Sequence, residues 1–252
     1  MQRIDGRLPE EIRKSRVLYD VYRYAPGSTL FSWGDTTVLS AVTLQAGVPS
    51  FLKGKHAGWL TAEYAMLPAA THVRMTRDSS AVKRNGRGIE ISRLIGRVLR
   101  SVINLSHLGE NTITIDCDVL HADGGTRTAA INGAFLALRA AQARWLRNGT
   151  IKAPLLREDI AAISVGVVDS EVMIDLTYAE DSAAQADCNF VLTRSGKVIE
   201  IHNSSEREPL LWEQVIRAQT LAQQGIQHFF AMLDEQHATI SFLEMLSRAE
   251  KM

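Results

Sequence analysis

The run Asp123-Gly124-Gly125-Thr126-Arg127-Thr128 constrains the fold of this chain more than any other segment. Before it, apolar residues from Ile113 to Val119 alternate with polar ones, which predicts a β-strand. After it, residues 129–146 are rich in alanine and leucine and contain no proline, which predicts an α-helix. The paired glycines between them predict a tight reversal of the backbone, because glycine adopts conformations that other residues avoid.

Two interpretations fit this run. In the first it is an anion-binding turn, because glycine lets the backbone approach a ligand closely and the first N–H groups of a helix have no internal partner. Arg127 would add a guanidinium fork suited to phosphate oxygens. In the second it is a structural turn in which Thr126 caps the helix. The motif alone favours the second interpretation slightly.

Composition and the first residues of the chain indicate a folded protein that does not enter a membrane. Its 252 residues suffice for one large domain or two modest ones, and its 46% hydrophobic and 22% charged residues are ordinary for a chain with a core. No apolar run is long enough to span a bilayer, and the N-terminus lacks the apolar segment of a signal peptide. We therefore expect a cytoplasmic protein whose cysteines, Cys117 and Cys188, are reduced core residues.

Charge is unevenly distributed although the formal net charge is zero. Residues 158–193 contain eight acidic residues and neither lysine nor arginine. Residues 74–100 contain two acidic residues and eight basic ones: Arg74, Arg77, Lys83, Arg84, Arg87, Arg93, Arg97 and Arg100. Such a cationic segment either binds phosphate groups or neutralises the acidic segment within the fold, and charge alone supports both hypotheses equally.

The order of the expected elements predicts an α+β architecture. Residues 16–47 have the alternation and turn dipeptides of an antiparallel meander, and residues 48–86 are expected to form a long irregular loop. From Glu90 to Ile103 apolar residues follow helical spacing, with Arg93, Arg97 and Arg100 on the opposite face. Those arginines are expected either to face solvent or to contact phosphates or carboxylates.

A polar connector at residues 147–158, with Pro154, divides the chain into expected halves of residues 1–150 and 151–252. The second half repeats the order of the first, with strand-like segments from Ala161 to His202 and then a helical region from Pro209 to about Ala249. Two halves that each place strands before helices indicate a duplicated unit.

Asp181 and Asp187 flank a short run of small residues, with Glu180 beside them. If the two carboxylates converge, they suit Mg²⁺, which binds through one or two carboxylates together with substrate phosphates. The alternative is an Asp-Ser turn followed by an aspartate that begins a strand, and the sequence alone favours it. The histidines show no zinc-binding spacing, and neither a G-x-S-x-G nor a Walker A motif is present.

Taken in order, several segments resemble the ribonuclease PH family of phosphorolytic 3′→5′ exoribonucleases. The resemblance runs from residue 3 to about residue 235 and is specific because the set occurs in the order of the family. The segments are Arg3-Ile4-Asp5-Gly6-Arg7, Gly34-Asp35-Thr36-Thr37-Val38-Leu39, Phe51-Leu52-Lys53-Gly54-Lys55, Gly58-Trp59-Leu60-Thr61-Ala62-Glu63-Tyr64, Arg93-Leu94-Ile95-Gly96-Arg97, Asp116-Cys117-Asp118-Val119-Leu120, Ala122-Asp123-Gly124-Gly125-Thr126-Arg127-Thr128-Ala129 and Glu180-Asp181-Ser182-Ala183-Ala184.

The resemblance implies roles for particular residues. It implies that phosphate is bound by Arg87, Gly125, Thr126 and Arg127. It implies that Asp181 and Asp187 are catalytic and bind the metal. It also implies that Arg74 and Arg77 contact RNA.

The resemblance also implies a fold and a reaction. The fold would consist of two α+β halves like domain 2 of ribosomal protein S5, and the assembly would be a homo-hexameric ring built as a trimer of dimers. Inorganic phosphate, with Mg²⁺, would attack the last phosphodiester of an RNA 3′ end, chiefly of transfer RNA precursors and also of ribosomal RNA. The alternative is a non-catalytic RNA-binding subunit of an exosome-like ring.

Three positions depart from the pattern of the family. Ala69 stands where an arginine of the RNA-contacting loop is usual, and Gly88-Ile89 replaces Thr-Gln after the phosphate-binding arginine. The run His202-Asn203-Ser204-Ser205-Glu206-Arg207 replaces Gln-Gly-Thr-Ala-Glu-Gly. Because two glycines are lost, this last change predicts altered local geometry.

Overall fold

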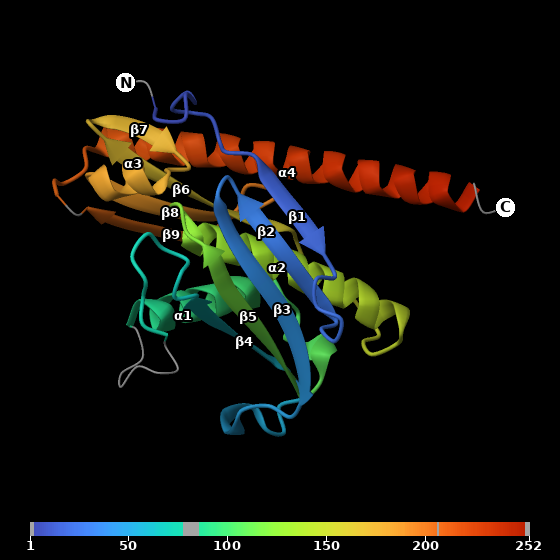
Figure 1. Ribbon diagram of the computed structural model, residues 1–252. Helices are drawn as coiled ribbons and strands as arrows, with labels where there is room; N and C mark the ends of the chain where they lie inside the picture. The colour runs from blue at the N-terminus through green and yellow to red at the C-terminus, as the bar shows by residue number, and fades with distance from the viewer. Residues whose placement is uncertain (1–2, 78–85, 206, 250–252) are drawn as a thin grey trace.

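The computed structural model describes residues 3–77, 86–205 and 207–249, and it has two β-sheets with helices packed on and between them. The first sheet is mixed, with strand order β1-β2-β3-β5-β4, and only the β4–β5 pair is parallel. The second sheet is antiparallel, with order β7-β6-β8-β9. This arrangement confirms the predicted α+β class (Figure 1).

The strands of the first sheet are β1 (Ser15–Tyr19), β2 (Gly27–Trp33), β3 (Thr36–Ala46), β4 (Trp59–Met66) and β5 (Asn111–His121). Those of the second sheet are β6 (Ile160–Val168), β7 (Glu171–Ile174), β8 (Ala186–Thr193) and β9 (Val198–Ser205). The α-helices are α1 (Gly86–Ser101), α2 (Thr126–Arg147), α3 (Tyr178–Ala183) and α4 (Trp212–Ala249), and two 3₁₀ turns span Ser50–Leu52 and Leu105–Leu108.

Helix α2 lies at the centre of the molecule because it is apolar on nearly all sides. It packs against β2, β3 and β5 of the first sheet and against β6 of the second (Figure 1). Helix α4 covers β6, β7 and β8, and its C-terminal part extends beyond the sheets in Figure 1. Phe229 of α4 stacks on Trp33 and meets Phe31 edge-on, so aromatic contacts join the last helix to the first sheet.

The sequence predicted several elements well. The strand before the glycine turn, the helix after it and the antiparallel meander are all present. The expected apolar face of α1, from Ile91 to Val102, is buried. Cys117 and Cys188 are free and buried as expected, and burial raises the pKa of each thiol to about 12. No helix among the described residues combines the length and apolarity needed to cross a membrane.

Two expectations about local structure were wrong. The range 48–86 is not wholly irregular, because it contains β4, in which Leu60, Ala62 and Tyr64 point into the core. The strand escaped prediction because alanine at 62 and 65 weakens its apolar alternation. Thr126 does not cap α2: the N-cap is Gly125, and Thr126 is the first helical residue.

Candidate functional site

A cleft between the two halves contains two adjoining cavities that share Arg87, Gly125, Thr126 and Asp181. The polar cavity, of about 230 Å³, is also lined by Arg127, Ser164, Ser182, Ala184, Ala186, Asp187 and Asn189. All six residues expected to bind phosphate or act in catalysis therefore line one cavity, although they come from four different elements and the turn before α2.

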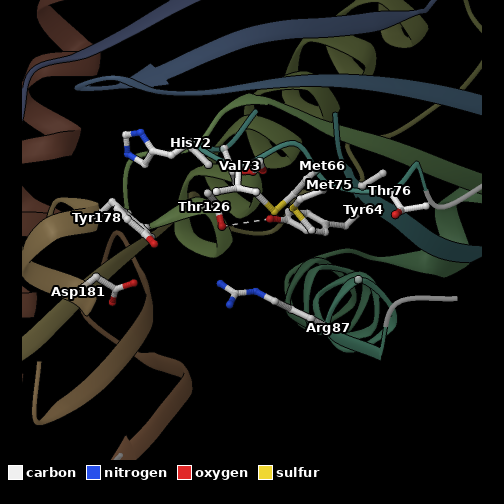
Figure 2. Close-up of a pocket in the computed structure, with 16 residues that line it drawn as sticks. Tyr64, Met66, His72, Val73, Met75, Thr76, Arg87, Thr126, Tyr178 and Asp181 are labelled. Atoms are coloured by element: carbon white, nitrogen blue, oxygen red, sulfur yellow. Dashed lines mark hydrogen bonds between the residues drawn. The ribbon is translucent and has the colours of Figure 1, made fainter. Parts of the chain in front are cut away.

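The second cavity, of about 290 Å³, has more apolar walls. In Figure 2, Arg87 extends into it from the start of α1, and Asp181 and Tyr178 lie on the facing side. His72 belongs to the segment after β4, and its ring lies 5.3 Å from that of Tyr178 in the other half. The wall near Tyr64 is formed by methionine, valine and threonine side chains, so this cavity offers apolar surface directly beside the polar one.

The backbone of the glycine turn requires its two glycines. Gly124 and Gly125 have φ of 72° and 64°, in the left-handed region that glycine tolerates best. A Cβ on Gly124 would lie 2.3 Å from the carbonyl oxygen of Leu176, so the turn packs directly against the second half. Gly125 has no side chain to cap the helix, and the first residues of α2, Thr126 and Arg127, line the polar cavity, so their backbone N–H groups are suited to binding an anion there.

A buried ionic network holds this turn in place. Arg13 donates to the carbonyl oxygen of Asp123 at 2.5 Å and to both carboxylate oxygens of Asp175, at 2.7 and 3.0 Å. Asp175 also accepts from the indole of Trp33 at 2.8 Å. The hydroxyl of Thr36 donates to the carbonyl oxygen of Gly124 at 2.6 Å. The turn is thereby tied to β2, to the start of β3 and to the segment after β7.

Tyr64 orients the side chain of Thr126. Its hydroxyl donates to Oγ1 of Thr126 at 3.0 Å, as the dashed line in Figure 2 marks. Burial raises the pKa of Tyr64 above its usual value, so the phenol keeps its proton and remains a donor. Since Oγ1 accepts this bond, the proton of Thr126 is available to a group in the cavity.

The two cations of the polar cavity come from different helices. Arg87 lies at the start of α1 and lines both cavities. Arg127 lies in the first turn of α2 and pairs with Glu90 of α1 at 3.0 Å. This exposed carboxylate engages only Nη2 of Arg127 in that pair, so the guanidinium keeps other N–H groups for an anion.

Both aspartates lie in regular structure: Asp181 is in a helix and not in the Asp-Ser turn of the alternative interpretation, whereas Asp187 stands at the start of a strand, as that interpretation predicted. Asp181 is in α3, whose start has a capping box between Thr177 and Glu180. Asp187 is the second residue of β8 and accepts from Nδ2 of Asn189 at 2.9 Å. Glu180 is buried and forms a two-pronged ion pair with Arg3 at 2.7 and 2.8 Å, which fixes α3 against the N-terminal segment.

The donor set of the polar cavity fits a magnesium ion that is only partly held by protein. No group of three or more histidine, cysteine or acidic side chains in residues 3–77, 86–205 and 207–249 forms a metal cluster. Asp181 and Asp187 nevertheless line the same cavity. A pair of carboxylates beside an anion site matches the preference of Mg²⁺ for one or two carboxylates with substrate phosphates.

Arg74 and Arg77 lie outside the cleft. They are exposed in the segment after β4, and neither lines either of the two cavities described above, whereas His72, Val73, Met75 and Thr76 of the same segment line the second one. Burial raises the pKa of Asp118, and the nearby Arg77 opposes that rise. Lys83 and Arg84 of the same basic segment lie outside the described residues.

The arginines on α1 contact groups of this same chain. Arg97 pairs with Glu200 of β9 at 2.5 and 3.0 Å. Arg100 donates to the carbonyl oxygen of Leu60 and lies 4.5 Å above the ring of Trp59. These observations favour the carboxylate and packing interpretation for Arg97 and Arg100 over direct phosphate contacts.

The changed run near the site does not disturb the second sheet. β9 continues through Ser205, with Asp187 paired to Ser204 and Cys188 to Asn203. The side chain of Asn203, at one lost glycine, accepts from the thiol of Cys188 at 3.1 Å. Glu206 lies outside the described residues. Residues 202–205 thus form regular strand structure although the run departs from the pattern of the family.

Three further residues, Ser164, Asn189 and Arg13, belong to the site or support it, although the sequence did not predict them there. Ser164 and Asn189 face each other across the β6–β8 pair, and both line the polar cavity. The serine within the otherwise apolar run 160–168 was a signal in the sequence, because a hydroxyl in a buried strand needs a hydrogen-bond partner. Arg13 lies in the charged N-terminal region, where its sequence context resembles that of a surface residue.

Comparison with known proteins gives two family matches and a group of similar folds. Residues 11–144 match domain 1 of the 3′ exoribonuclease family, and residues 160–225 match domain 2. Rice (Oryza sativa) Rrp46 is 21% identical, with a TM-score of 0.70 over 90% of this chain and 97% of that one. A chain of the Archaeoglobus fulgidus exosome with RNA bound to the active site is 20% identical, with a TM-score of 0.78 over 92% of each chain. A chain of an archaeal exosome core is 20% identical, with a TM-score of 0.73 over 90% of this chain and 89% of that one.

Proposed function

This chain belongs to the 3′ exoribonuclease family, and from that premise we propose that it is a phosphorolytic enzyme. It shortens RNA one nucleotide at a time from the 3′ end, with inorganic phosphate as the nucleophile, and releases nucleoside diphosphates. One observation carries the proposal: two arginines, a helix N-terminus and two aspartates line a single polar cavity. Those groups suit an anionic nucleophile and a metal-assisted phosphoryl centre.

The main obstacle to this reaction is bringing two anions together, since phosphate already carries the charge of a nucleophile. Arg87, Arg127 and the first N–H groups of α2 bind the phosphate and neutralise its charge. The hydroxyl of Thr126, oriented by Tyr64, provides a further donor. Because the buried network around Arg13 fixes the turn, these donors are positioned before the substrate arrives.

The reaction exchanges one phosphorus–oxygen bond for another. An oxygen of inorganic phosphate bonds to the phosphorus of the last phosphodiester, and the bond from that phosphorus to the 3′ oxygen of the preceding nucleotide breaks. The leaving oxygen takes a proton and becomes the new 3′ hydroxyl. That proton comes from the attacking hydrogen phosphate and is passed on by Asp181 or Asp187, and Asn189 holds the carboxylate of Asp187 in place. The reverse reaction adds a nucleotide from a nucleoside diphosphate.

Mg²⁺, when bound at Asp181 and Asp187, supplies positive charge next to the scissile phosphate and the leaving oxygen. The neighbouring apolar-walled cavity suits the base and ribose of the terminal nucleotide, since Met66, Val73 and Tyr178 offer apolar surface there. Arg74 and Arg77, exposed beside this cavity, contact the RNA backbone farther from the 3′ end.

The proposed substrates are chiefly transfer RNA precursors, with ribosomal RNA as a further substrate, in the cytoplasm. The proposed assembly is a homo-hexamer built as a trimer of dimers. Leu211, Trp212 and Ile216 are exposed together around the start of α4, which supports burial of that surface in an assembly.

A second candidate function is a non-catalytic RNA-binding ring subunit. It is favoured by the loss of a loop arginine at Ala69, whose exposed position would have held a further cation for RNA. It is opposed by the intact set of arginines and aspartates in the polar cavity and by the regular strand through Ser205.

The two candidates are separated by incubating the protein with polyadenylate, phosphate and Mg²⁺. The proposed enzyme releases ADP, needs phosphate, and makes polyadenylate from ADP when phosphate is absent. Release of AMP would indicate hydrolysis and contradict the phosphorolytic mechanism. Binding of polyadenylate without release of any nucleotide would support the non-catalytic subunit.

A further inference from the structure

Two buried hydroxyl groups, Oγ of Ser15 and Oγ of Ser164, have no hydrogen-bond partner among the residues that the structure describes. A buried hydroxyl without a partner destabilises a folded protein, so each such group calls for an explanation. Ser164 is 4% exposed and lines the polar cavity, whereas Ser15 is 9% exposed and lines neither cavity of the cleft. The two serines thus differ in whether a ligand can reach them.

The backbone of Ser164 is fixed from both sides. Ser164 lies in the middle of β6 and pairs with Asn189 of β8. Its carbonyl oxygen accepts from the backbone N–H of Asp175 at 2.7 Å. Since Asp175 is itself bound by Arg13, the position of Ser164 is coupled to the network that holds the glycine turn. Its hydroxyl can therefore move only by rotation about χ1.

The hydroxyl of Ser164 lies beside the N-terminus of α2. Asn132 of α2 exchanges two hydrogen bonds with the backbone of Ala162, at 2.8 and 2.9 Å, which docks the helix on β6. Ala162 and Ser164 are two residues apart and share a face of the strand. Oγ of Ser164 is 3.6 Å from the point where a Cβ on Gly125 would lie. The serine thus adjoins the turn that presents free N–H groups.

We propose that Ser164 is a further phosphate-binding residue of this site, and that its hydroxyl donates to an oxygen of the attacking inorganic phosphate. This inference rests on the proposed phosphorolytic function. The other donors of the cavity approach from α1 and α2, and Ser164 approaches from β6, so the phosphate is held from the second half of the chain as well. Phosphate also provides the partner that the buried hydroxyl lacks among the described residues.

Asp187 is a less suitable partner for this hydroxyl. Asn189, directly opposite Ser164, already donates to Oδ2 of Asp187. The serine and the asparagine therefore serve neighbouring groups: Asn189 holds the carboxylate, and Ser164 holds the anion beside it. The proposed contact is to a phosphate oxygen that does not attack, so the bond is present in both the bound state and the transition state. Such a contact lowers KM for phosphate and leaves kcat nearly unchanged.

The test compares Ser164→Ala with Ser15→Ala, which also removes a buried hydroxyl that has no partner among the described residues. For Ser164→Ala, we expect KM for phosphate to rise roughly 10- to 100-fold with kcat within about twofold, as for a hydrogen bond to a charged group. KM for ADP in the reverse reaction rises by a similar factor. The melting temperature of either variant without phosphate is unchanged or higher, because an unsatisfied group is removed. Ser15→Ala leaves both KM values unchanged.

Binding gives a second readout that does not depend on turnover. Inorganic phosphate raises the melting temperature of the wild type and of Ser15→Ala, and Ser164→Ala needs roughly 10- to 100-fold more phosphate for the same rise. Ser164→Cys, which keeps the size of the side chain but donates weakly, falls between alanine and the wild type.

Several outcomes would overturn the inference. If the wild type releases ADP and Ser164→Ala keeps its KM for phosphate, the partner of the hydroxyl is water and only this inference falls. The same holds if Ser164→Ala changes the Mg²⁺ requirement alone, because the serine would then serve the metal. If the wild type neither turns over nor responds to phosphate, the proposed function and this inference fall together.

Discussion

The glycine turn at residues 123–127 and the loop at residues 67–77 both face the cleft, but they are held in opposite ways. The turn accepts a hydrogen bond from Arg13, which is itself paired with the buried Asp175, and it has no space for an added methyl group at Gly124. The loop has exposed side chains and few fixing contacts, such as the backbone bond from Ala122 to Ala70 and the ring contact of His72.

The difference between the fixed turn and the exposed loop matches two different roles in the proposed function. Groups that act on the reacting phosphate lose effectiveness when displaced by about 1 Å, so the fold keeps them in a buried frame. Groups that attract a long polyanion act through charge over several ångströms and tolerate motion. A change in the loop such as Ala69 is therefore expected to reduce the proposed activity less than a change in the turn.

Gly124→Ala is expected to have the largest effect on stability and activity, because the added methyl group lies in the turn itself and has no space there. The new Cβ would lie 2.3 Å from a backbone oxygen, so either α2 or the segment after Leu176 must move. We expect a destabilisation of about 3 kcal/mol or more and loss of activity, measured by urea unfolding and by ADP release.

Gly196→Ala is the matched control for Gly124→Ala. Gly196 has φ of 85°, which imposes similar backbone strain, but nothing lies within 4 Å of its added Cβ. Its cost should stay near 1 kcal/mol, with activity retained. Equal losses in the two variants would mean that backbone strain, and not contact with the second half, limits the turn.

Asp181→Asn and Asp187→Asn are expected to follow, with activity falling about 10³-fold. The amide keeps the shape of the carboxylate but loses the charge that holds a cation, which is worth several kcal/mol at the transition state. Each variant is compared with Asp169→Asn, at an exposed turn, over a Mg²⁺ titration. If either variant turns over like the wild type, that aspartate is structural: part of the α3 helix for Asp181, or a strand-start residue for Asp187.

Glu180→Gln tests the ion pair with Arg3 that fixes α3, the helix of Asp181, against the N-terminal segment. Burial opposes ionisation, but hydrogen bonds from Arg3 and from Thr177 outweigh it and hold the pKa of Glu180 below its usual value. A lowered folded-state pKa contributes stability above the unfolded pKa, and this stability is lost as pH falls through the folded value. We expect the variant to be about 3 kcal/mol less stable at pH 7, because Arg3 is left buried without its partner.

The difference between the wild type and Glu180→Gln should start to shrink as the pH falls below about 4.3, the ordinary pKa of a glutamate in an unfolded chain, and should shrink further as the pH approaches the lowered folded-state pKa. Urea unfolding at pH 7 and pH 3.5 measures it. A constant difference at both values would show that the carboxylate is not the source of the stability.

Arg127→Ala is expected to lower the rate about 10²-fold at low phosphate, because one charge-assisted hydrogen bond to a developing charge is removed. The same holds for Arg87→Ala. Phosphate titrations of ADP release measure both, and Arg97→Ala is the control, since Arg97 is engaged by Glu200. Normal phosphate kinetics in Arg127→Ala would mean that its pair with Glu90 is its whole role.

The sequence predicted the helices and strands of the molecule better than the details of its site. Helix and strand periodicity identified α1, α2 and β5, because each signal lies within one continuous segment. The resemblance to a known family identified six of the residues that line the polar cavity, and their roles stay predictions. The helical position of Asp181 was missed although Thr177-Tyr178-Ala179-Glu180 has the pattern of a capping box.

Ser164, Asn189 and Arg13 could not be assigned to the site from one sequence. The two strand residues meet only because β6 and β8 pair in a particular register, and that register is set by the packing of α2 and α4 on the sheet. Arg13 is buried only because Asp175, which is 162 positions away, supplies its charge partner. Such distant pairings leave no local pattern.

Joint replacement of Arg74 and Arg77 by alanine is expected to have the smallest effect on the chemical step. It tests the comparison of turn and loop by changing the loop alone. Both side chains are exposed and neither lines a cavity, so short oligonucleotides should be degraded at nearly the wild-type rate. Long structured RNA should bind more weakly, and the slope of log affinity against log salt should fall by about one unit for each RNA phosphate that an arginine no longer neutralises. Because Ala69 leaves the loop with one arginine fewer than is usual, the wild-type slope should itself be shallow. Disrupting the proposed ring should weaken binding of long RNA further, since several loops then no longer act together. Equal losses on short and long RNA would assign these arginines to the reacting phosphate or to the fold, and would remove the distinction between a fixed turn and a tolerant loop.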